Sequence, residues 1–462
     1  MLNSNLIEKL KSIVGPNGYL ENADISPAYH HDISGIRTGM PLIVLRPSNT
    51  DEVSQILKLC NDVRQPVIPQ GGMTGLVSAG TPVNGEVALS LQRMNRIEDF
   101  DDASALMTVQ AGTPLQAVQE AADKMEMFFP LDIGSRGSCT IGGNLSTNAG
   151  GNRVIRYGMA RDLVLGLEVV LADGTIINNL NKMRKNNAGY DFKNLFMGSE
   201  GTLGILTRAV LILHPKPTSK QVAFCSLSGF PEAISLLKLL KVELGGRLSA
   251  FEALWSDAFD LIINSVPKIR SPVKEKYPLY ILIEATGSNT ESDQTSFEMA
   301  LKKAIEKEYI KDVVIAQSLK EIEELWAVRD GISEAVLKLN PFLSYDVSLD
   351  IKSMGHFAKD IQEHFKKRWG NANIGIFGHI GDGNIHIVTD VGADGITSRS
   401  AVDDLVYGTV RDAKGSISAE HGIGFQKKSW LSYSRSKEEI DLMRTLKSAL
   451  DPNCILSPGR VI

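Results

Sequence analysis

The spacing of apolar side chains predicts a strand, a helix and a second strand over residues 42 to 70. Leu42 to Leu45 form a short apolar run. Thr50 is a suitable N-cap residue for the helix, whose apolar positions recur at helical spacing at Val53, Ile56, Leu57 and Cys60. Pro66 then begins a new strand with Val67 and Ile68. The chain therefore starts a domain in which helices and strands are mixed.

The same periodicities predict further elements on both sides of a segment that is poor in large apolar side chains. A helix begins at Thr113 and Pro114, with Leu115 and Val118 facing inward. A strand runs from Val164 to Leu171, and another ends at Leu213. Regular elements at both ends argue against a flexible linker at residues 130 to 151 and favour the wall of a ligand site.

Three glycine-rich loops separate these elements. The first follows a strand and reads Pro69-Gln70-Gly71-Gly72-Met73-Thr74-Gly75-Leu76, the second extends from Pro130 to Gly151, and the third from Gly198 to Ile205. Such loops present backbone N–H groups to a phosphate, although one loop alone is equally consistent with a sharp turn. No loop has the order strand, G-x-G-x-x-G, helix, and no G-x-x-x-x-G-K-[ST] occurs. Together they predict a dinucleotide site without a Rossmann fingerprint.

Two short segments late in the chain contain histidines beside a carboxylate. Residues 377–386 include His379 and His386, and residues 418–422 include Glu420 and His421. His379, His386 and Glu420 have the donors that a divalent cation needs in a catalytic site with one open position, which would leave His421 as a base. Residues 382–384, Asp-Gly-Asn, are also good turn chemistry, so the histidines could instead flank a hairpin and bind nothing. The spacing leaves both interpretations open.

Arg329 falls within an apolar helical stripe. The stripe runs from Glu321 to Leu339 and consists of Ile322, Leu325, Trp326, Ile332, Ala335 and Val336. Ser333 lies one turn after Arg329. A guanidinium on a buried face needs an anionic partner, which is either an internal carboxylate or the carboxylate of a substrate.

Charge and cysteine usage exclude several classes of protein. A formal net charge of −5 over 462 residues gives no electrostatic footprint for nucleic acid or an anionic membrane. No uncharged apolar run reaches the roughly 18 residues of a membrane-spanning helix. The four cysteines lack Cys-x-x-Cys spacing, which argues against a thiolate metal site and a disulfide framework. With no signal or transit character at the N-terminus, these features predict a soluble cytoplasmic protein.

In this order, the segments closely resemble FAD-binding proteins of the vanillyl-alcohol-oxidase type, and more narrowly their D-2-hydroxyglutarate and D-lactate dehydrogenase branch. The resemblance covers residues from about 30 to Arg460 and rests on P-Q-G-G-x-T-G, G-S-C-x-I-G-G-N, N-A-G-G, R-Y-G, G-S-E-G-T-L-G-I, G-H-x-G-D-G-N-x-H and A-E-H-G-I-G. It implies an α+β protein with a p-cresol methylhydroxylase (PCMH) type FAD-binding domain of two α+β subdomains. An antiparallel-sheet substrate domain and a C-terminal helical segment would follow. The expected bounds are 1–37 for an N-terminal helical segment, 38–217 for the FAD-binding domain, 218–416 for the substrate domain and 417–462 for the segment that completes the flavin site.

The resemblance also gives each site residue an expected role. FAD would bind non-covalently at residues 69–76, with its pyrophosphate on Gly71, Gly72, Thr74 and Gly75 and its adenosine end near Glu200, Gly201 and Ile205. The other expected cofactor residues are Pro130, Asp132, Gly137, Ser138, Thr140, Ile141, Gly142, Gly143, Asn144, Thr147, Asn148, Gly150, Gly204 and Asn453. A divalent metal, expected to be zinc, would bind His379, His386 and Glu420. Arg329, Ser333 and His421 would contact the substrate, with His421 as the catalytic base.

Three residues depart from the pattern of these relatives. Met73 stands where relatives commonly have asparagine, and the chain has no histidine for the covalent flavin link of some cousins. Ser344 replaces a lysine typical of the hydroxyglutarate enzymes, and Val388 replaces an asparagine two positions after the second histidine. These losses weaken the case for a substrate with a second carboxylate.

The sequence thus predicts oxidation of a D-2-hydroxy acid to its 2-oxo acid, with hydride transfer to flavin N5 and metal-assisted removal of the hydroxyl proton. The expected electron acceptor is an electron-transfer flavoprotein or a quinone. An oxidase that uses oxygen and a flavin- or metal-binding protein without turnover both stay open as alternatives. The sequence also leaves a homodimer open.

Overall fold

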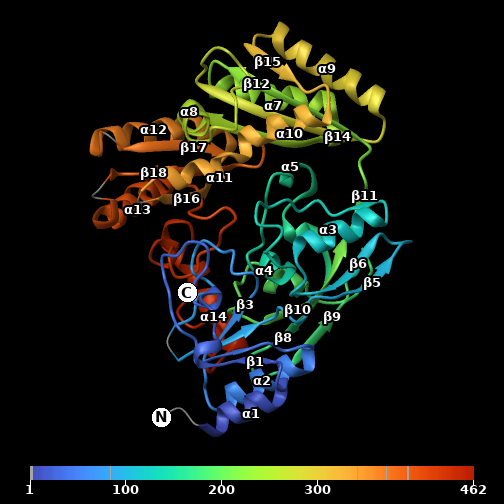
Figure 1. Cartoon of the computed structure of the whole chain (residues 1–462), viewed down its shortest axis with the longest axis vertical. Helices are drawn as coiled ribbons and strands as arrows, with labels where there is room; N and C mark the ends of the chain where they lie inside the picture. The colour runs from blue at the N-terminus through green and yellow to red at the C-terminus, as the bar shows by residue number, and fades with distance from the viewer. Residues whose placement is uncertain (1–3, 84, 341, 371, 393–394) are drawn as a thin grey trace. The chain divides into compact units, whose positions relative to one another are not determined.

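The computed structural model describes residues 4–83, 85–340, 342–370, 372–392 and 395–462 (Figure 1). The chain forms two compact units, which are described separately. Unit 1 contains residues 1–150, 158–216 and 420–462, and unit 2 contains residues 151–157 and 217–419. Each unit combines helices with β-sheet, which confirms the predicted α+β class.

Unit 1 begins with a four-stranded sheet in the order β1-β2-β4-β3. Its strands are β1 (Tyr19–Leu20), β2 (Ile43–Leu45), β3 (Val67–Gln70) and β4 (Val87–Ser90). The last three are parallel, so their carboxyl ends share one edge, where ligands bind in open sheets of this kind. Helices α1 (Ser4–Val14) and α2 (Thr50–Asp62) contribute to the apolar core of this sheet, which includes Leu10, Ile56 and Val87.

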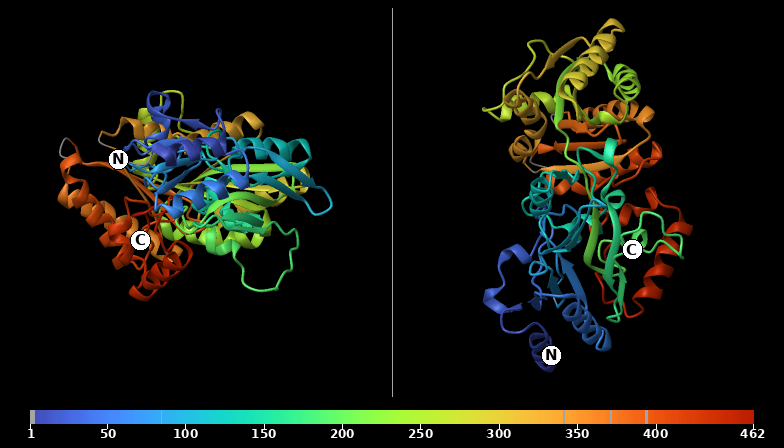
Figure 2. Two further views of the ribbon diagram at one scale, coloured as in Figure 1. Left: turned by 90° about the horizontal axis from the view of Figure 1, so that it is seen from below. Right: turned by 90° about the vertical axis from the view of Figure 1, so that its right-hand side faces the viewer.

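A second sheet of unit 1 is antiparallel, in the order β5-β6-β10-β8-β9. Its strands are β5 (Ile97–Asp101), β6 (Leu106–Gln110), β8 (Val164–Val170), β9 (Ile176–Asn179) and β10 (Ile205–Ile212). The remaining elements of unit 1 are α3 (Leu115–Lys124), β7 (Met127–Phe128), α4 (Ile141–Ser146), α6 (Lys193–Phe196), β11 (His214–Pro215) and α14 (Lys437–Leu450). Between β9 and α6, residues 180–192 form a long and mostly exposed loop (green in the left view of Figure 2).

Unit 2 is built on a seven-stranded antiparallel sheet in the order β15-β12-β14-β13-β17-β18-β16. The strands are β12 (Ser219–Leu227), β13 (Leu248–Trp255), β14 (Leu279–Gly287), β15 (Asp312–Ile315), β16 (Leu343–Ser348), β17 (Asn373–Gly378) and β18 (Asn384–Asp390). The helices are α5 (Val154–Tyr157), α7 (Phe230–Leu244), α8 (Ser256–Ser265), α9 (Thr290–Glu306), α10 (Leu319–Asp330), α11 (Ile332–Ala335), α12 (Met354–Arg368) and α13 (Gly395–Asp412) (Figure 1).

Side chains alternate between the two faces of this sheet. One face carries Val222, Phe224, Leu254 and Leu282 into an apolar cluster with α8, α10 and α11. The intervening residues of the same strands face the opposite side, where α7 and α9 pack against the strands. The candidate site in unit 2 lies on the first of these faces.

The local predictions hold in most places, with two corrections. The strands after residues 42 and 66 and the helix beginning near Pro114 form as expected. The N-cap of α2 is Asn49 rather than Thr50, because the Asn49 side chain accepts the Glu52 N–H at 2.9 Å while the Thr50 hydroxyl donates to Glu168. The predicted helix from residue 321 to 339 is broken at Gly331, which packs against Ile269.

Within the described ranges, every helix is too short or too polar to cross a membrane.

Candidate active site

A β-hairpin in unit 2 brings His379 and His386 together. The turn between β17 and β18 is closed by the backbone N–H groups of Asp382 and Asn384, which donate to the His379 carbonyl at 3.1 and 3.2 Å. The two imidazole centroids lie 5.4 Å apart with the rings at 88°. A ligand nitrogen of each ring lies within 4.8 Å of one on the other, and both residues are buried. The hairpin and the histidine pair are therefore one feature.

Glu252, absent from the predicted site residues, holds His379 in place. It lies in β13 and is only 1% exposed. Its carboxylate accepts from Nδ1 of His379 at 2.7 Å and from Nε of Arg329 at 2.9 Å. Burial alone would raise the pKa of Glu252, but its interactions with His379 and Arg329 lower it below the usual value. The sequence signal was the single acidic residue in the mostly apolar strand Leu248–Trp255.

Arg329 therefore has the internal carboxylate partner that was one of its two interpretations. It lies near the end of α10, with 12% of its side chain exposed. The ion pair uses Nε, while Nη2 lies 3.4 Å from Nε2 of His379. The guanidinium carbon is also 5.8 Å from the ring centroid of Phe377. Arg329 therefore lies beside His379. The role of Arg329 in substrate binding stays a prediction.

Asp346 is the corresponding carboxylate beside His386. The two residues face each other in the pairing of β16 with β18, and Oδ1 of Asp346 lies 3.8 Å from Nδ1 of His386. The same oxygen accepts from the Asn384 amide at 2.9 Å, and Oδ2 accepts the backbone N–H of Ala419 at 3.1 Å. The Asp346 carboxylate thus ties the backbone at Ala419 to the strands of unit 2.

The predicted metal ligands are divided between the units, because Glu420 and His421 begin the C-terminal part of unit 1. Glu200 fixes the residues that follow them. Its carboxylate accepts the backbone N–H groups of residues 423 and 424 at 2.7 and 2.8 Å. Burial raises the pKa of Glu200, and these two hydrogen bonds oppose that shift. The carboxylate therefore holds the C-terminal segment, whereas the prediction placed Glu200 near the adenosine end of the cofactor.

The three glycine-rich loops converge in unit 1. A Cβ atom on Gly72 would lie 1.9 Å from the carbonyl oxygen of Ser138, so the first and second loops meet backbone to backbone. A Cβ atom on Gly201 would lie 2.5 Å from Cγ of Pro69, which brings the third loop against the first. These glycines are required because no larger side chain fits between the loops.

The first loop has the donors that a pyrophosphate needs. Among the described residues, none accepts a hydrogen bond from the backbone N–H groups of residues 71–76. Met73 adopts a left-handed backbone with φ of 54°, and most of these residues are half-buried. A run of N–H groups at the carboxyl end of a parallel strand is a suitable anion site. The residues of unit 1 therefore fit a bound dinucleotide.

The second loop leads into α4, whose N-cap is Thr140. The Asn148 side chain accepts the Arg161 N–H at 3.0 Å, and the Asn453 side chain donates to the Asn61 carbonyl at 3.3 Å. These two predicted cofactor residues use their side chains within the protein, so any contact of theirs with a cofactor would come mainly from the backbone. The other predicted cofactor residues lie in the same three loops of unit 1.

The two departures at Ser344 and Val388 are directly opposite each other. They form one cross-strand pair of β16 and β18. Val388 is buried among apolar residues, and a Cβ atom on Gly375 would lie 3.1 Å from its Cγ2. Ser344 is half-buried. The cross-strand pair of Ser344 and Val388 therefore carries no charge. Ser333, which is predicted to contact the substrate, lies on α11 and is exposed.

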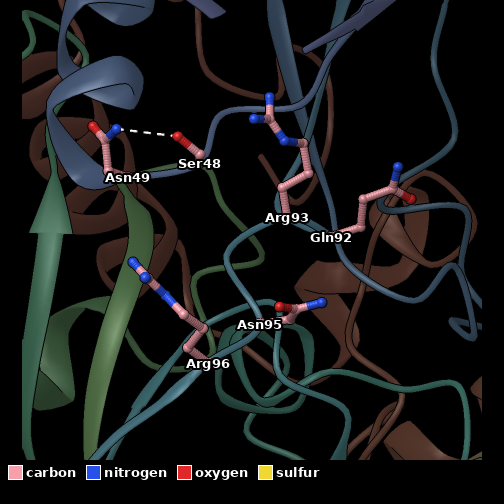
Figure 3. A pocket seen from close by; sticks show the side chains of 6 residues that line it. All are labelled: Ser48, Asn49, Gln92, Arg93, Asn95 and Arg96. Carbon is pink, nitrogen blue, oxygen red and sulfur yellow. Dashed lines mark hydrogen bonds between the residues drawn. The ribbon is translucent and has the colours of Figure 1, made fainter. Parts of the chain in front are cut away.

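A separate pocket in unit 1 has a volume of about 740 Å³. Polar side chains line it, namely Ser48, Asn49, Gln92, Arg93, Asn95 and Arg96 (Figure 3). Arg93 donates to the Arg46 carbonyl at 2.8 Å, and Asn49 caps α2 and donates to Ser48. These hydrogen bonds stabilise the chain at and before the N-terminus of α2. No predicted site residue lines the pocket.

Two family models match the chain. The model of an FAD binding domain matches residues 41–179, and the model of the C-terminal domain of FAD linked oxidases matches residues 216–461. The mitochondrial D-2-hydroxyglutarate dehydrogenase of Arabidopsis thaliana is 39% identical over 462 residues, which is 100% of this chain and 82% of that protein. The putative mitochondrial D-lactate dehydrogenase of Schizosaccharomyces pombe is 37% identical and covers 99% of this chain, which spans 90% of that protein.

Among solved structures, p-cresol methylhydroxylase with substrate bound has a TM-score of 0.79 at 15% sequence identity. The match covers 99% of this chain and 96% of that protein. At this identity the likeness shows the fold alone, and it confirms the predicted PCMH-type fold.

The cytoplasmic expectation is wrong, because the Arabidopsis thaliana and Schizosaccharomyces pombe relatives are mitochondrial proteins. That expectation rested on an N-terminus without signal or transit character and on two features of the whole chain, the cysteine spacing and the absence of apolar spans. Neither of these two features separates one reducing compartment from another.

Identity near 40% over the whole chain decides the relationship more firmly than any single motif, since it covers both the glycine loops of unit 1 and the hairpin of unit 2. The chain belongs to the family of FAD-linked oxidoreductases that includes the D-2-hydroxyglutarate dehydrogenases.

Proposed function

We propose that the protein oxidises a D-2-hydroxy acid to its 2-oxo acid with FAD and a divalent cation, which we take to be zinc. The pairing of His379 with His386 on one hairpin, each beside a buried carboxylate, is the observation that carries this proposal. The names of the relatives support the substrate class. When bound, the flavin supplies a two-electron acceptor at N5 and the cation supplies a Lewis acid for the hydroxyl group.

The residues present fit a divalent cation. His379, His386 and Glu420 would hold it, and two imidazole nitrogens with one carboxylate form a donor set typical of catalytic zinc sites that keep a position open. Glu252 is the partner that such a histidine usually has on its other ring nitrogen, and the Asp346 carboxylate lies 3.8 Å from Nδ1 of His386. Ala419 supports the third ligand, because its hydrogen bond to Asp346 keeps the chain close to the hairpin immediately before Glu420.

The chain's own residues then divide the work on the substrate. Arg329 binds a substrate carboxylate through its terminal nitrogens while Glu252 holds Nε. Ser333, on α11 beyond the break at Gly331, adds a hydroxyl. His421 removes the hydroxyl proton as a hydride leaves C2, so the acid loses two electrons and two hydrogens in total. Positioning of the acid between these groups lowers the barrier further, because it holds the reacting atoms in place before the reaction.

The electrons would pass to an electron-transfer flavoprotein or a quinone. An oxidase that reduces oxygen is the alternative within enzymes, and it would form hydrogen peroxide during turnover without an added acceptor. A flavin- or metal-binding protein without turnover is the alternative outside enzymes. The uncharged pair Ser344 and Val388 keeps that alternative open, since it differs from the lysine and asparagine expected in the hydroxyglutarate branch.

An anaerobic titration tests the proposal. Purified protein is mixed in turn with D-lactate, D-malate and D-2-hydroxyglutarate, with and without prior treatment with a chelator, and the visible absorption of the flavin is recorded. We expect one acid to bleach the flavin and the chelator to abolish the bleaching. Bleaching by all three acids regardless of chelator would remove the metal from the mechanism, and a colourless protein that cannot bind FAD would refute the proposal.

A pair of histidine variants sharpens the test. His421→Ala should retain flavin and metal but lose bleaching by at least about a hundredfold in rate, which is the usual contribution of a general base. His356→Ala is the matched control, because His356 lies exposed on α12 beside Asp360. Equal rates for the two variants would exclude His421 as the base.

A further inference from the structure

Helix α10 is attached to the sheet of unit 2 by two polar contacts. Trp326 donates from Nε1 to Glu284 at 3.1 Å, and Arg329 donates from Nε to Glu252 at 2.9 Å. Residues three apart lie on the same face of a helix, and the two carboxylates lie on the neighbouring strands β14 and β13. The contacts look equivalent, but the Glu252 carboxylate also binds His379.

The register of the sheet explains why Glu252 meets His379. Strand β13 pairs with β17 at Ala253 and Gly378. One residue further in the same antiparallel register, Glu252 faces His379. Both side chains are almost fully buried, at 1% and 5% exposed. The contact therefore follows from strand pairing and does not depend on a flexible loop.

The chemistry of the contact selects one ring nitrogen of His379. A carboxylate only accepts hydrogen bonds, so Nδ1 of His379 carries the hydrogen of the 2.7 Å contact. The lone pair of the neutral ring then lies on Nε2, and the carboxylate makes that nitrogen a better ligand. The bond from Arg329 to the same carboxylate also fixes the plane of the guanidinium.

We infer that Glu252 is a positioning residue that orients a metal ligand and the substrate-binding arginine at the same time. The inference rests on the proposed function, because it requires His379 to bind the cation and Arg329 to bind the acid. An ordinary internal ion pair would stabilise the fold without any effect on metal affinity. Metal affinity therefore separates the two roles.

The decisive comparison is between Glu252→Gln and Glu284→Gln. Glu284 is the matched control because its carboxylate is also buried, lies on the adjacent strand and binds the same helix through Trp326. Its cationic partners are Arg153 and Lys220, which are outside the proposed site. The metal-free full-length protein is titrated with zinc against a chromophoric chelator, and the thermal midpoint and FAD absorbance of each variant are recorded alongside.

We expect Glu252→Gln to bind zinc about 10- to 100-fold more weakly than the wild type, which is the usual effect of losing such a partner. Glu284→Gln should keep the wild-type affinity even if its thermal midpoint falls. Zinc affinity unchanged in both variants would overturn the inference and leave the proposed function intact. A wild-type protein that does not bind zinc would overturn the metal in the proposed function and the inference with it.

A second variant covers the case in which Glu252→Gln does not fold. Glu252→Asp keeps the charge but withdraws the carboxylate by one methylene, so zinc affinity should fall less than in the glutamine variant. In both variants KM for the acid should rise more than kcat falls, because Arg329 loses its fixed plane. A fall in kcat alone, with KM and zinc affinity unchanged, would contradict a positioning role.

Discussion

Replacing Glu200 by glutamine tests whether its carboxylate positions the segment that begins with Glu420 and His421. The carboxylate accepts the N–H groups of residues 423 and 424, two and three positions after His421. Gly422 faces the same carboxylate, since a Cβ atom there would lie 2.8 Å from Cδ of Glu200. A disturbance at Glu200 must therefore be transmitted along a very short stretch of chain to the proposed base.

The magnitude follows from the two hydrogen bonds. A bond to a charged group contributes about 1.5–3 kcal/mol. Glutamine has one carbonyl oxygen and one NH2 group, so it keeps one bond and turns a donor toward the second N–H. The bound position of the segment should lose about 1.5–3 kcal/mol, which corresponds to a fall in kcat of about 10- to 150-fold.

Glu200→Gln should also change how the free energy of unfolding depends on pH. Burial raises the pKa of Glu200 in the folded protein, so the folded state holds this proton more tightly than the unfolded chain does. The free energy of unfolding therefore falls as pH rises from the ordinary carboxyl pKa of about 4.3 through the raised value. The glutamine variant lacks this dependence. Its stability relative to the wild type should therefore be greater when measured at pH 8 than at pH 4.

The assay measures kcat with an artificial acceptor, the flavin content, and urea unfolding at both pH values. Asp451→Asn is the matched control, because the buried Asp451 carboxylate also accepts two backbone N–H groups, from residues 455 and 456, at 2.9 and 2.8 Å. That variant should lose stability but keep kcat within about threefold of the wild type. A Glu200→Gln variant with unchanged kcat would refute the positioning argument, and loss of flavin as its main defect would return Glu200 to the predicted cofactor role.

Three further outcomes follow from other parts of the structure. Arg460→Ala should lower the free energy of unfolding by about 3–5 kcal/mol in a urea titration. The reason is that Arg460 is fully buried in an ion pair with Glu86 at 2.6 Å. A loss below about 1 kcal/mol would contradict this. Ser344→Lys should raise kcat/KM for D-2-hydroxyglutarate relative to D-lactate by about tenfold, because it adds a charge for a second carboxylate, and an unchanged ratio in steady-state kinetics would exclude that role. The exposed Cys454 should react with a thiol reagent in the native protein. Burial raises the pKa of Cys60 to about 12, so Cys60 should react only after unfolding. Rapid labelling of the native Cys454→Ser variant would contradict this order.

Much of the fold was accessible from the sequence because local patterns determine it. The period of apolar residues located the strand at residue 67 and the helix after Pro114, and the structure has both. The N-cap of α2 was misplaced by one residue, since Asn49 and Thr50 are both good caps and the choice depends on the contact of Thr50 with Glu168 on β8. Sequence alone carries no information on that distant contact.

The same limit explains the site residues that the sequence did not reveal. Glu252 lies 127 positions before His379, and Glu200 lies 223 positions before Ile423. Each is a single acidic residue without a motif that names its partner. Only the pairing of β13 with β17 and the close approach of the C-terminal segment within unit 1 show what they bind. An acidic residue in an apolar strand was nevertheless a usable signal, because a buried carboxylate needs partners.

At both ambiguous places in unit 2, the two competing interpretations prove to be compatible. The turn at residues 382–384 was an argument for a simple hairpin, yet the hairpin is what sets His379 and His386 at 5.4 Å and 88°. The ion pair of Arg329 was an argument against substrate binding, yet it uses Nε and fixes the plane of the remaining nitrogens. A buried site needs such supports, because side chains that are to bind a metal or an anion must be held in one orientation before the ligand arrives. At Arg329 the structural contact and the proposed ligand contact therefore use different atoms, since Nε pairs with Glu252 and the terminal nitrogens would bind the acid.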